Sequence, residues 1–242
     1  MAPVTRYQLT IAPTAEDLAR QAAERVASAI DLALAQRDRA QIALAGGSTP
    51  AAAYRRLGAE HLPWHRVDVV LGDERWVPAD HPDSNARLLG DTLLAAEPGR
   101  QASFHPAPTD RSDPAEGAAA YAKLIASLCP GDPPRFDLVL LGLGDDGHTA
   151  SLFPGTAAPG VVDRWVTVGE GKGLPRLTIT APVLSAARSV IFLVSGAGKA
   201  TALQRLLDPS ESPQRTPARL VQPQVEVQIL ADAEAAALVA NS

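Results

Sequence analysis

Short apolar runs recur along the chain, and they constrain the fold more than any other feature. Six runs are rich in apolar and β-branched residues: VTRYQLTI (4–11), QIALA (41–45), VDVVL (67–71), FDLVLLGL (136–143), SVIFLV (189–194) and VEVQIL (225–230). Several are apolar at consecutive positions, as parallel strands are when helices cover both faces of their sheet. The runs therefore predict a mainly parallel sheet buried between helices.

Segments with helical spacing separate these runs. Residues 14–36 open with Thr14, carry Glu16 and Asp17 in the first turn, and then repeat apolar residues at helical intervals. Further helices are predicted at about 50–57, 84–95, 113–128, 197–207 and 231–238. Alternating strands and helices predict an α/β three-layer sandwich with a mainly parallel central sheet.

Length and composition favour one domain. The chain has 242 residues, 46% hydrophobic and 20% charged, which is globular composition. The Pro-rich stretch 106–114 is the best candidate boundary, but no change in composition supports two domains, so residues 1–242 are expected to form one. A chain this long needs neither disulfides nor a structural metal. Its single cysteine, Cys129, is expected to be buried and indicates a reducing compartment.

Charge and hydropathy argue against several classes of protein. Against 22 Lys and Arg stand 27 Asp and Glu, and this net charge of −5 disfavours a nucleic-acid-binding surface. No signal peptide is visible, and no uncharged apolar run approaches the ~18 residues that span a bilayer. We expect a cytoplasmic protein, a monomer or weak homodimer, with neither a nucleic-acid nor a membrane partner.

Four predicted strands run directly into a polar turn that contains glycine. These turns are ALAGGSTP, VLGDERW, LGLGDDGHTAS and LVSGAGKAT. Ligands of open parallel sheets bind beyond the carboxyl ends of the strands. The sequence therefore predicts one shared site at this edge of the sheet.

The first turn has the features of a phosphate site. Gly46 and Gly47 allow close backbone approach, Ser48 and Thr49 supply hydroxyl groups, and Pro50 suits the start of a helix. Free N–H groups and the positive end of a helix dipole favour an anion there. Neither GxxxxGK[ST] nor GxSxG is present, which disfavours a Walker loop and a serine-hydrolase elbow. A capped tight turn is the alternative.

Two other turns supply cations. Lys199 lies where a helix is predicted to begin, a position that the helix dipole disfavours unless an anionic ligand offsets it. In GDERW, Arg75 would hold the anion, while Asp73 or Glu74 would hold a sugar hydroxyl or a catalytic side chain. A solvated lysine and a local ion pair are the respective alternatives.

The turn LGLGDDGHTAS carries the candidate for proton transfer. His148 follows Asp145 and Asp146, and an imidazole with a reference pKa of about 6.5 suits proton transfer at neutral pH. Asp146 would fix the tautomer of His148 or raise its basicity. These residues with Asp73 or Glu74 also offer metal ligands, but their spacing matches no zinc motif such as HExxH, so no metal is expected.

Taken in order, four motifs give the chain a resemblance to a known family. AGGSTP, GDERWV followed by HPDSNARLL, FDLVLLGLGDDGHTASLFP, and SGAGKA resemble the 6-phosphogluconolactonases of the pentose phosphate pathway. The resemblance extends from the first predicted helix to LADAEAAALV and implies the Rossmann-like fold of the sugar-phosphate isomerase group, which includes glucosamine-6-phosphate deaminase. It implies hydrolysis of 6-phospho-D-glucono-1,5-lactone to 6-phosphogluconate without a cofactor.

The resemblance also implies roles for individual residues. His148 matches the histidine of the DGH motif, and Asp146 matches the acidic residue two positions before it. Arg75 and Lys199 match the cationic positions. The phosphate cradle corresponds to Gly46, Gly47, Ser48 and Thr49. With these roles, a neutral His148 would deprotonate the attacking water and then protonate the departing ring oxygen.

Two departures from related sequences bear on the alternatives. The deaminases carry a glutamate five residues after the DGH histidine, where this chain has Phe153, and this disfavours a deaminase or sugar-phosphate isomerase. Ile229 stands where many relatives have tryptophan, which affects local packing. A non-catalytic sugar-phosphate sensor is the other alternative, but no basic helix-turn-helix accompanies the chain. Arg219 is a further residue that would approach the ligand.

Overall fold

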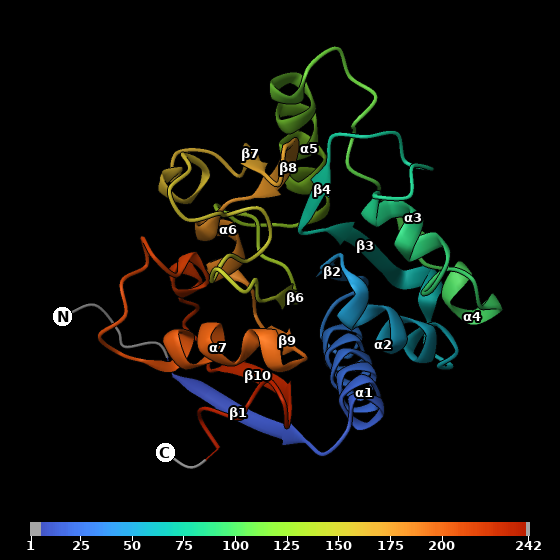
Figure 1. The fold of residues 1–242 in the computed structure, drawn as a ribbon. Helices are drawn as coiled ribbons and strands as arrows, with labels where there is room; N and C mark the ends of the chain where they lie inside the picture. The colour runs from blue at the N-terminus through green and yellow to red at the C-terminus, as the bar shows by residue number, and fades with distance from the viewer. Residues whose placement is uncertain (1–5, 241–242) are drawn as a thin grey trace.

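The structure is a computed structural model that describes residues 6–240. Within these residues seven strands form a central sheet in the order β1-β10-β9-β6-β2-β3-β5, and every pairing is parallel (Figure 1). Residues 4 and 5 of the first predicted run lie outside the described residues. The strands are β1 (Tyr7–Ala12), β2 (Ala40–Leu44), β3 (Val67–Leu71), β5 (Ser103–Phe104), β6 (Leu138–Gly142), β9 (Val190–Val194) and β10 (Val227–Asp232). The predicted parallel sheet is confirmed.

The order of the strands creates a crevice in the middle of the central sheet. From β2 the chain continues to β3 and β5 on one side, whereas β6, β9 and β10 occupy the other side. The loops that follow the neighbouring strands β2 and β6 therefore diverge. Such a switch in strand order is where open parallel sheets bind ligands.

A second, antiparallel sheet stands beside the first and was not predicted. It contains β4 (Asp73–Arg75), β8 (Leu174–Ile179) and β7 (Val166–Gly171), in that order. The prediction of a polar turn at GDERW was wrong in this respect, because Asp73–Arg75 pairs with β8 as an extended strand. The sheet rises above the carboxyl edge of the central sheet, next to α5 (Figure 1).

The helices agree with the predictions in most places. The longest, α1 (Ala15–Leu34), begins after Thr14, whose Oγ1 accepts a hydrogen bond from the amide of Asp17 at 3.0 Å. None of the helices in residues 6–240 is both long and apolar enough to cross a membrane. The other α-helices are α2 (Ser48–Gly58), α3 (Asn85–Gly90), α4 (Glu97–Arg100), α5 (Pro114–Leu128), α6 (Ala181–Ala186) and α7 (Ala200–Leu207).

Two of the predicted helices differ from the structure. The helix predicted over 84–95 ends at Gly90, and residues 91–95 form turns. The helix predicted over 231–238 is absent from the described residues, since Ala231 and Asp232 complete β10 and residues 233–240 form turns. Pairing of Ala231 with Val194 of the neighbouring strand extends β10 past the point where the local pattern becomes helical.

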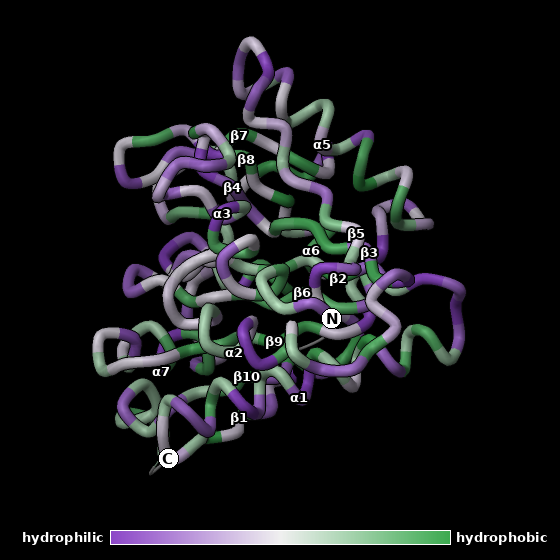
Figure 2. The backbone as a smooth tube through the Cα atoms, turned by 90° about the vertical axis from the view of Figure 1, so that its right-hand side faces the viewer, coloured by the Kyte–Doolittle hydropathy of each residue, from purple (hydrophilic) through white to green (hydrophobic). Residues whose placement is uncertain are grey.

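Alternate side chains of the central sheet point into two hydrophobic layers. Ile42 of β2 packs with α1, α2 and α3, whereas Ala43 belongs to the layer that contains α5, α6 and α7. The second layer also contains Leu177 and Ile179 of the second sheet, so both sheets share one core. Figure 2 shows the hydrophobic stretches through the middle of the molecule.

Two residues singled out in the sequence lie in the second layer. Ile229, which stands where many relatives have tryptophan, is fully buried there. Cys129 is buried too, and burial raises the pKa of its thiol to about 12. A thiol with this pKa is protonated at neutral pH, so Cys129 is a packing residue rather than a nucleophile.

Candidate active site

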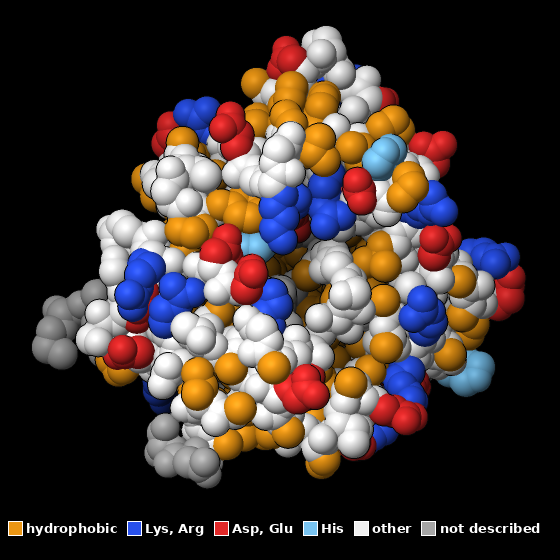
Figure 3. All heavy atoms as spheres, in the orientation of Figure 1, with side chains coloured by type: hydrophobic (Ala, Val, Ile, Leu, Met, Phe, Trp, Pro, Cys, Tyr) orange, Lys and Arg blue, Asp and Glu red, His pale blue; other side chains and the backbone are white. Residues whose placement is uncertain are grey.

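A cavity of about 290 Å³ opens at the carboxyl edge of the central sheet. Figure 3 shows a hollow in the middle of this face, with Lys and Arg side chains gathered beside it. The structure brings together residues of all four glycine-containing turns. The sequence-predicted residues that line the cavity are Gly46, Gly47, Ser48, Thr49, Asp73, Arg75, His148 and Lys199.

His148 and Asp146 form a hydrogen-bonded pair in the loop after β6. The distance between His148 Nδ1 and Asp146 Oδ1 is 2.5 Å, and the same oxygen accepts the amide N–H of His148 at 3.0 Å. Burial acts to raise the pKa of Asp146, but these hydrogen bonds outweigh it and hold the pKa below its usual value. The carboxylate is therefore ionised at neutral pH and accepts a hydrogen bond from Nδ1–H, which leaves Nε2 of His148 as the ring nitrogen free to take a proton.

Gly144 allows this pair to form. A Cβ added to Gly144 would lie 1.9 Å from His148 Nδ1 and 2.6 Å from Asp146 Oδ1. The loop then folds back on itself, with the amide of Gly144 donating to the carbonyl oxygen of His148 at 2.8 Å. The glycine thus leaves room for the imidazole directly against the backbone.

We expect Gly144→Ala to lower kcat by about tenfold or more, because the new methyl group must displace the imidazole from Asp146. Steady-state kinetics on the phosphorylated lactone that the family resemblance implies, alongside thermal unfolding, measure this effect. Gly160→Ala is the control, since an added Cβ there meets nothing within 4 Å. Equal kcat values for the two variants would contradict the role of Gly144.

An aromatic ring packs against the imidazole. The ring centroids of His148 and Phe153 lie 4.2 Å apart with an interplanar angle of 33°, and the guanidinium of Arg176 lies 5.4 Å from the Phe153 centroid. Phe153 thus lies next to the histidine, and its side chain cannot donate or accept a proton.

The turn after β2 leads into α2 without a side-chain cap. Gly47 is the N-cap residue and α2 begins at Ser48, so Pro50 is the third helical residue rather than the first. No side chain caps the first amides of this 11-residue helix within the described residues. These amides lie at the cavity together with the hydroxyl groups of Ser48 and Thr49, an arrangement that suits an anion.

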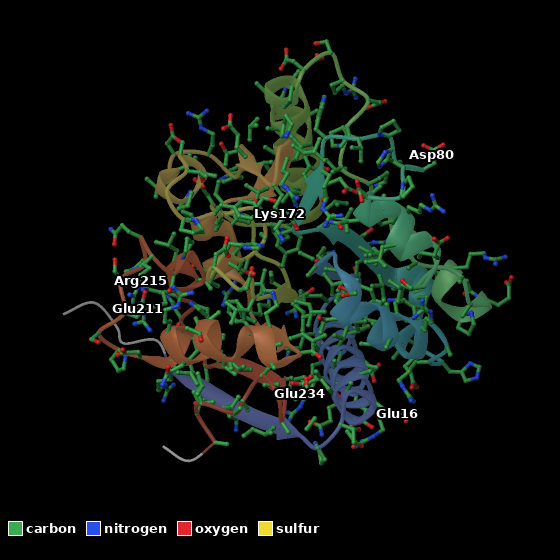
Figure 4. All side chains as sticks on the ribbon, in the orientation of Figure 1. Glu16, Asp80, Lys172, Glu211, Arg215 and Glu234 are labelled. Carbon is green, nitrogen blue, oxygen red and sulfur yellow. The ribbon has the colours of Figure 1, made fainter. Side chains whose placement is uncertain are left out.

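Four cationic side chains line the cavity. Arg75 and Lys199 were predicted, and Lys172 and Arg176 join them from the hairpin of β7 and β8. Figure 4 shows Lys172 near the middle of this face. Burial lowers the pKa of Arg176, and the neighbouring Asp73 opposes that shift. These two residues were not predicted because the hairpin of β7 and β8 was not predicted, although Gly-Lys-Gly, which includes the two turn residues Lys172 and Gly173, is a hairpin signal.

Hydrogen bonds hold Asp73 and Arg75 at the cavity. Asp73 Oδ2 accepts a hydrogen bond from Ser151 Oγ at 2.6 Å and lies 3.8 Å from a guanidinium nitrogen of Arg176. Arg75 donates from one guanidinium nitrogen to the carbonyl oxygen of Asp83, and its buried Nε has no hydrogen-bond partner among the described residues. Arg75 therefore retains an unused donor.

Glu74 serves the fold. Its buried carboxylate accepts the amides of Arg75, Asn85 and Ala86, each at 2.8 Å, and the hydroxyl of Ser84 at 3.1 Å. It therefore caps the start of α3, and it is not among the residues that line the cavity. Of the two carboxylates predicted for the ligand, the structure places Asp73 at the cavity and turns Glu74 away.

Glu74→Ala should lower the free energy of unfolding by about 2–4 kcal/mol, because several buried donors lose their acceptor at once. Urea denaturation measures the change. Glu97→Ala, which removes an exposed carboxylate from a surface ion pair, is the control and should cost less than about 1 kcal/mol. A Glu74→Ala variant as stable as this control would refute the capping role.

The loop that presents Lys199 is tied to β10. Asp232 accepts hydrogen bonds from Ser195 Oγ at 2.5 Å and from the amide of Gly196 at 2.9 Å. Lys199 then stands at the N-cap of α7. Arg219 points elsewhere, since it donates to the carbonyl oxygen of Leu206 at 2.6 Å and does not line the cavity. Residues 6–240 contain no group of three His, Cys, Asp or Glu side chains arranged to hold a metal ion.

An uncapped helix start, four cations and a histidine–carboxylate pair thus meet at a switch point of a parallel sheet. This arrangement is the one that an α/β protein needs to bind a small anionic ligand beside a histidine able to act as a general base. Comparison with known proteins gives the family.

The family model for glucosamine-6-phosphate isomerases/6-phosphogluconolactonase matches residues 13–230. A 6-phosphogluconolactonase of Synechocystis is 47% identical over 213 residues, which cover 87% of this chain and 89% of the relative, and one of Nostoc is 42% identical over 230 residues, covering 94% and 96%. The solved 6-phosphogluconolactonase of Trypanosoma brucei superposes with a TM-score of 0.86 at 32% identity, covering 98% of this chain and all of that one. The chain belongs to the glucosamine-6-phosphate isomerase/6-phosphogluconolactonase family.

Proposed function

We propose that this protein hydrolyses 6-phospho-D-glucono-1,5-lactone to 6-phospho-D-gluconate in the oxidative pentose phosphate pathway. The observation that carries the proposal is the His148–Asp146 pair, with a 2.5 Å contact, in a cavity that four cations line. A sugar-phosphate lactone has one anionic end to bind and one carbonyl carbon to attack, and the cavity offers a group for each. The activity of the 6-phosphogluconolactonases that resemble this chain supports the same reaction.

His148 acts as the general base. Asp146 accepts the hydrogen bond from Nδ1–H, so Nε2 takes a proton from water as the water attacks the lactone carbonyl carbon. The imidazolium then donates that proton to the ring oxygen as the C–O bond breaks, which regenerates neutral His148. Asp146 stabilises the imidazolium between these steps because its carboxylate remains ionised.

Cationic side chains stabilise the negative charge on the tetrahedral intermediate. The amides of Gly144 and Gly147 donate within their own loop, to the carbonyl oxygens of His148 and Gly144, and do not face the substrate. The two cations that are not assigned to the phosphate, Lys172 and Arg176, therefore fill the role that backbone amides have in other acyl-transfer sites.

The phosphate binds at the start of α2. The amides and hydroxyl groups of Ser48 and Thr49 hold its oxygens, and Arg75 and Lys199 neutralise its charge. Arg176 and Lys172 complete the cationic lining, and Asp73 accepts a hydrogen bond from a sugar hydroxyl. Binding of the phosphate positions the lactone carbon near His148.

Phe153 argues against deaminase or isomerase chemistry on this fold. Those reactions need an additional proton carrier beside the histidine, and the ring that packs 4.2 Å from the imidazole cannot provide one. The non-catalytic sensor has no observation in its favour, since a sensor does not need a carboxylate hydrogen-bonded to a histidine.

The organisation of the chain fits this function. A single domain is supported by the hydrophobic layer that both sheets share. A free, buried cysteine fits the reducing cytoplasm, where this reaction is expected. We propose a monomer or weak homodimer that needs no cofactor, nucleic acid or membrane.

A coupled assay tests the proposal. Freshly prepared 6-phosphogluconolactone is supplied with EDTA present, and an excess of 6-phosphogluconate dehydrogenase reports the product. Turnover well above the spontaneous rate supports lactone hydrolysis without a metal. Binding without turnover would favour the sensor, and release of ammonia from glucosamine 6-phosphate would favour the deaminase.

A further inference from the structure

Two segments outside the cavity, α7 and residues 217–220, hold the loop that carries His148, residues 142–149. Arg205 of α7 donates from a guanidinium nitrogen to the carbonyl oxygen of Asp145 at 3.2 Å. The amide of Ala218 donates to the carbonyl oxygen of Gly147 at 3.0 Å. These two bonds fix the backbone on both sides of the carboxylate that pairs with the histidine.

Thr216 packs directly against the turn at Gly147. Gly147 has a φ of +91°, and a Cβ added to it would lie 3.0 Å from Cα and Cγ2 of Thr216 and 3.1 Å from its Oγ1. Thr216 is fully buried and does not line the cavity. Its position therefore limits where the turn, and with it the next side chain in the loop, can lie.

A buried carboxylate fixes Thr216. Glu211 Oε1 accepts the Thr216 hydroxyl at 2.8 Å, and both carboxylate oxygens accept hydrogen bonds from Arg215. The Glu211 side chain is only 1% exposed, and Figure 4 shows it next to Arg215. The bonds from Arg215 lower the pKa of Glu211 to about 2, so it is ionised at neutral pH. Burying a charge is costly unless hydrogen bonds compensate it, and these bonds do so here.

We infer that Glu211 and Thr216 are positioning residues for the proposed general base. The carboxylate of Glu211 holds the Thr216 hydroxyl, and Thr216 holds the turn at Gly147 that sets the geometry between Asp146 and His148. The inference rests on the proposed function of His148. Because neither positioning residue lines the cavity, their loss affects the chemical step more than substrate binding.

Two substitutions test this role. Glu211→Gln removes the charge that holds Thr216, and Thr216→Val keeps the shape of the side chain without its hydroxyl. Each should lower kcat by about ten- to a hundredfold while KM stays within about twofold. Thr216→Ser keeps the hydroxyl that Thr216→Val removes, and it should therefore retain most of the wild-type kcat. If Glu211→Gln does not fold, Thr216→Val carries the test, because it leaves the buried ion pair between Glu211 and Arg215 in place.

Asp137→Asn is the matched control. Asp137 is also a buried carboxylate, 3% exposed, and it pairs with Arg37 at 2.7 Å and Arg188 at 3.3 Å. It lies just before β6, at the opposite end of that strand from the histidine loop. This variant should lower the melting temperature about as much as Glu211→Gln, and its kcat, measured well below that temperature, should equal that of the wild type.

Proton NMR gives a second measurement that does not depend on turnover. The proton between His148 Nδ1 and Asp146 should give a low-field resonance in the wild type, Thr216→Ser and Asp137→Asn, and this resonance should shift or broaden in Glu211→Gln and Thr216→Val. An unchanged resonance with wild-type kcat in the last two variants would overturn the inference, as would an equal loss of kcat in Asp137→Asn. A resonance that responds to Glu211→Gln in a protein without lactonase activity would refute the proposed function and leave the positioning role standing.

Discussion

Replacing His148 with asparagine should lower kcat on 6-phosphogluconolactone by about 10²–10⁴-fold, the range that general-base catalysis supplies. Asparagine can keep a donor near Asp146 but has no group in place of Nε2, the atom that takes the proton from water. KM should change by less than about threefold, because the phosphate contacts lie on other loops. The coupled dehydrogenase assay at neutral pH measures both constants.

His105→Gln provides the matched control for this variant. His105 is also a histidine paired with an aspartate, with 3.0 Å between Nε2 and Asp68 Oδ1, but it does not line the cavity. Its replacement should leave kcat unchanged. A His148→Asn variant with near-normal kcat would show that another group deprotonates the water, and the mechanism proposed above would fail.

Replacing Lys199 with methionine should reduce kcat/KM for the phosphorylated lactone by about ten- to a hundredfold. A hydrogen bond to a charged group is worth about 1.5–3 kcal/mol, which converts to this range. The same variant should hydrolyse unphosphorylated glucono-1,5-lactone about as well as the wild type, since that substrate has no phosphate for Lys199 to bind. Arg75→Met should show the same selectivity.

The comparison of the two lactones separates binding of phosphate from a general loss of structure. Lys123→Met, on an exposed position of α5, should leave both activities unchanged. If Lys199→Met lowered the activity on both lactones equally, the lysine would act on the reacting end of the substrate or on folding rather than on the phosphate.

The sequence was most informative where a local pattern and the final fold agree. The strands from β2 to β10 that lie inside the central sheet are buried on both faces, so their apolar runs were visible without any tertiary information. The same runs located the four turns that supply the cavity. His148 and its neighbour Asp146 could be chosen because a histidine beside carboxylates at a strand end is chemically distinctive.

The errors arose where tertiary contacts override local patterns. The alanine-rich segment from 231 onwards has helical spacing, but pairing with β9 and the hydrogen bonds that Asp232 accepts from Ser195 and Gly196 hold its start in the sheet. Strands β7 and β8 mix apolar residues with glycine, proline and arginine, so no clear period marks them. Because that hairpin was not predicted, the sequence did not indicate that Lys172 and Arg176 line the cavity.

The pairing of β2 with β6 sets the distance between the two ends of the proposed site. The turn that we propose binds the phosphate follows β2, and the histidine loop follows β6. The two strands are hydrogen-bonded neighbours through Ile42 and Ala43. Neighbouring strands lie about 4.8 Å apart, so the sheet fixes the spacing between the two ends of the site. We expect a phosphorylated lactone one carbon shorter or longer to bind its phosphate but to place its carbonyl carbon out of line with His148. We therefore expect the spacing of the two strands to favour substrates of one length, in addition to any contacts with the hydroxyl groups between the two ends.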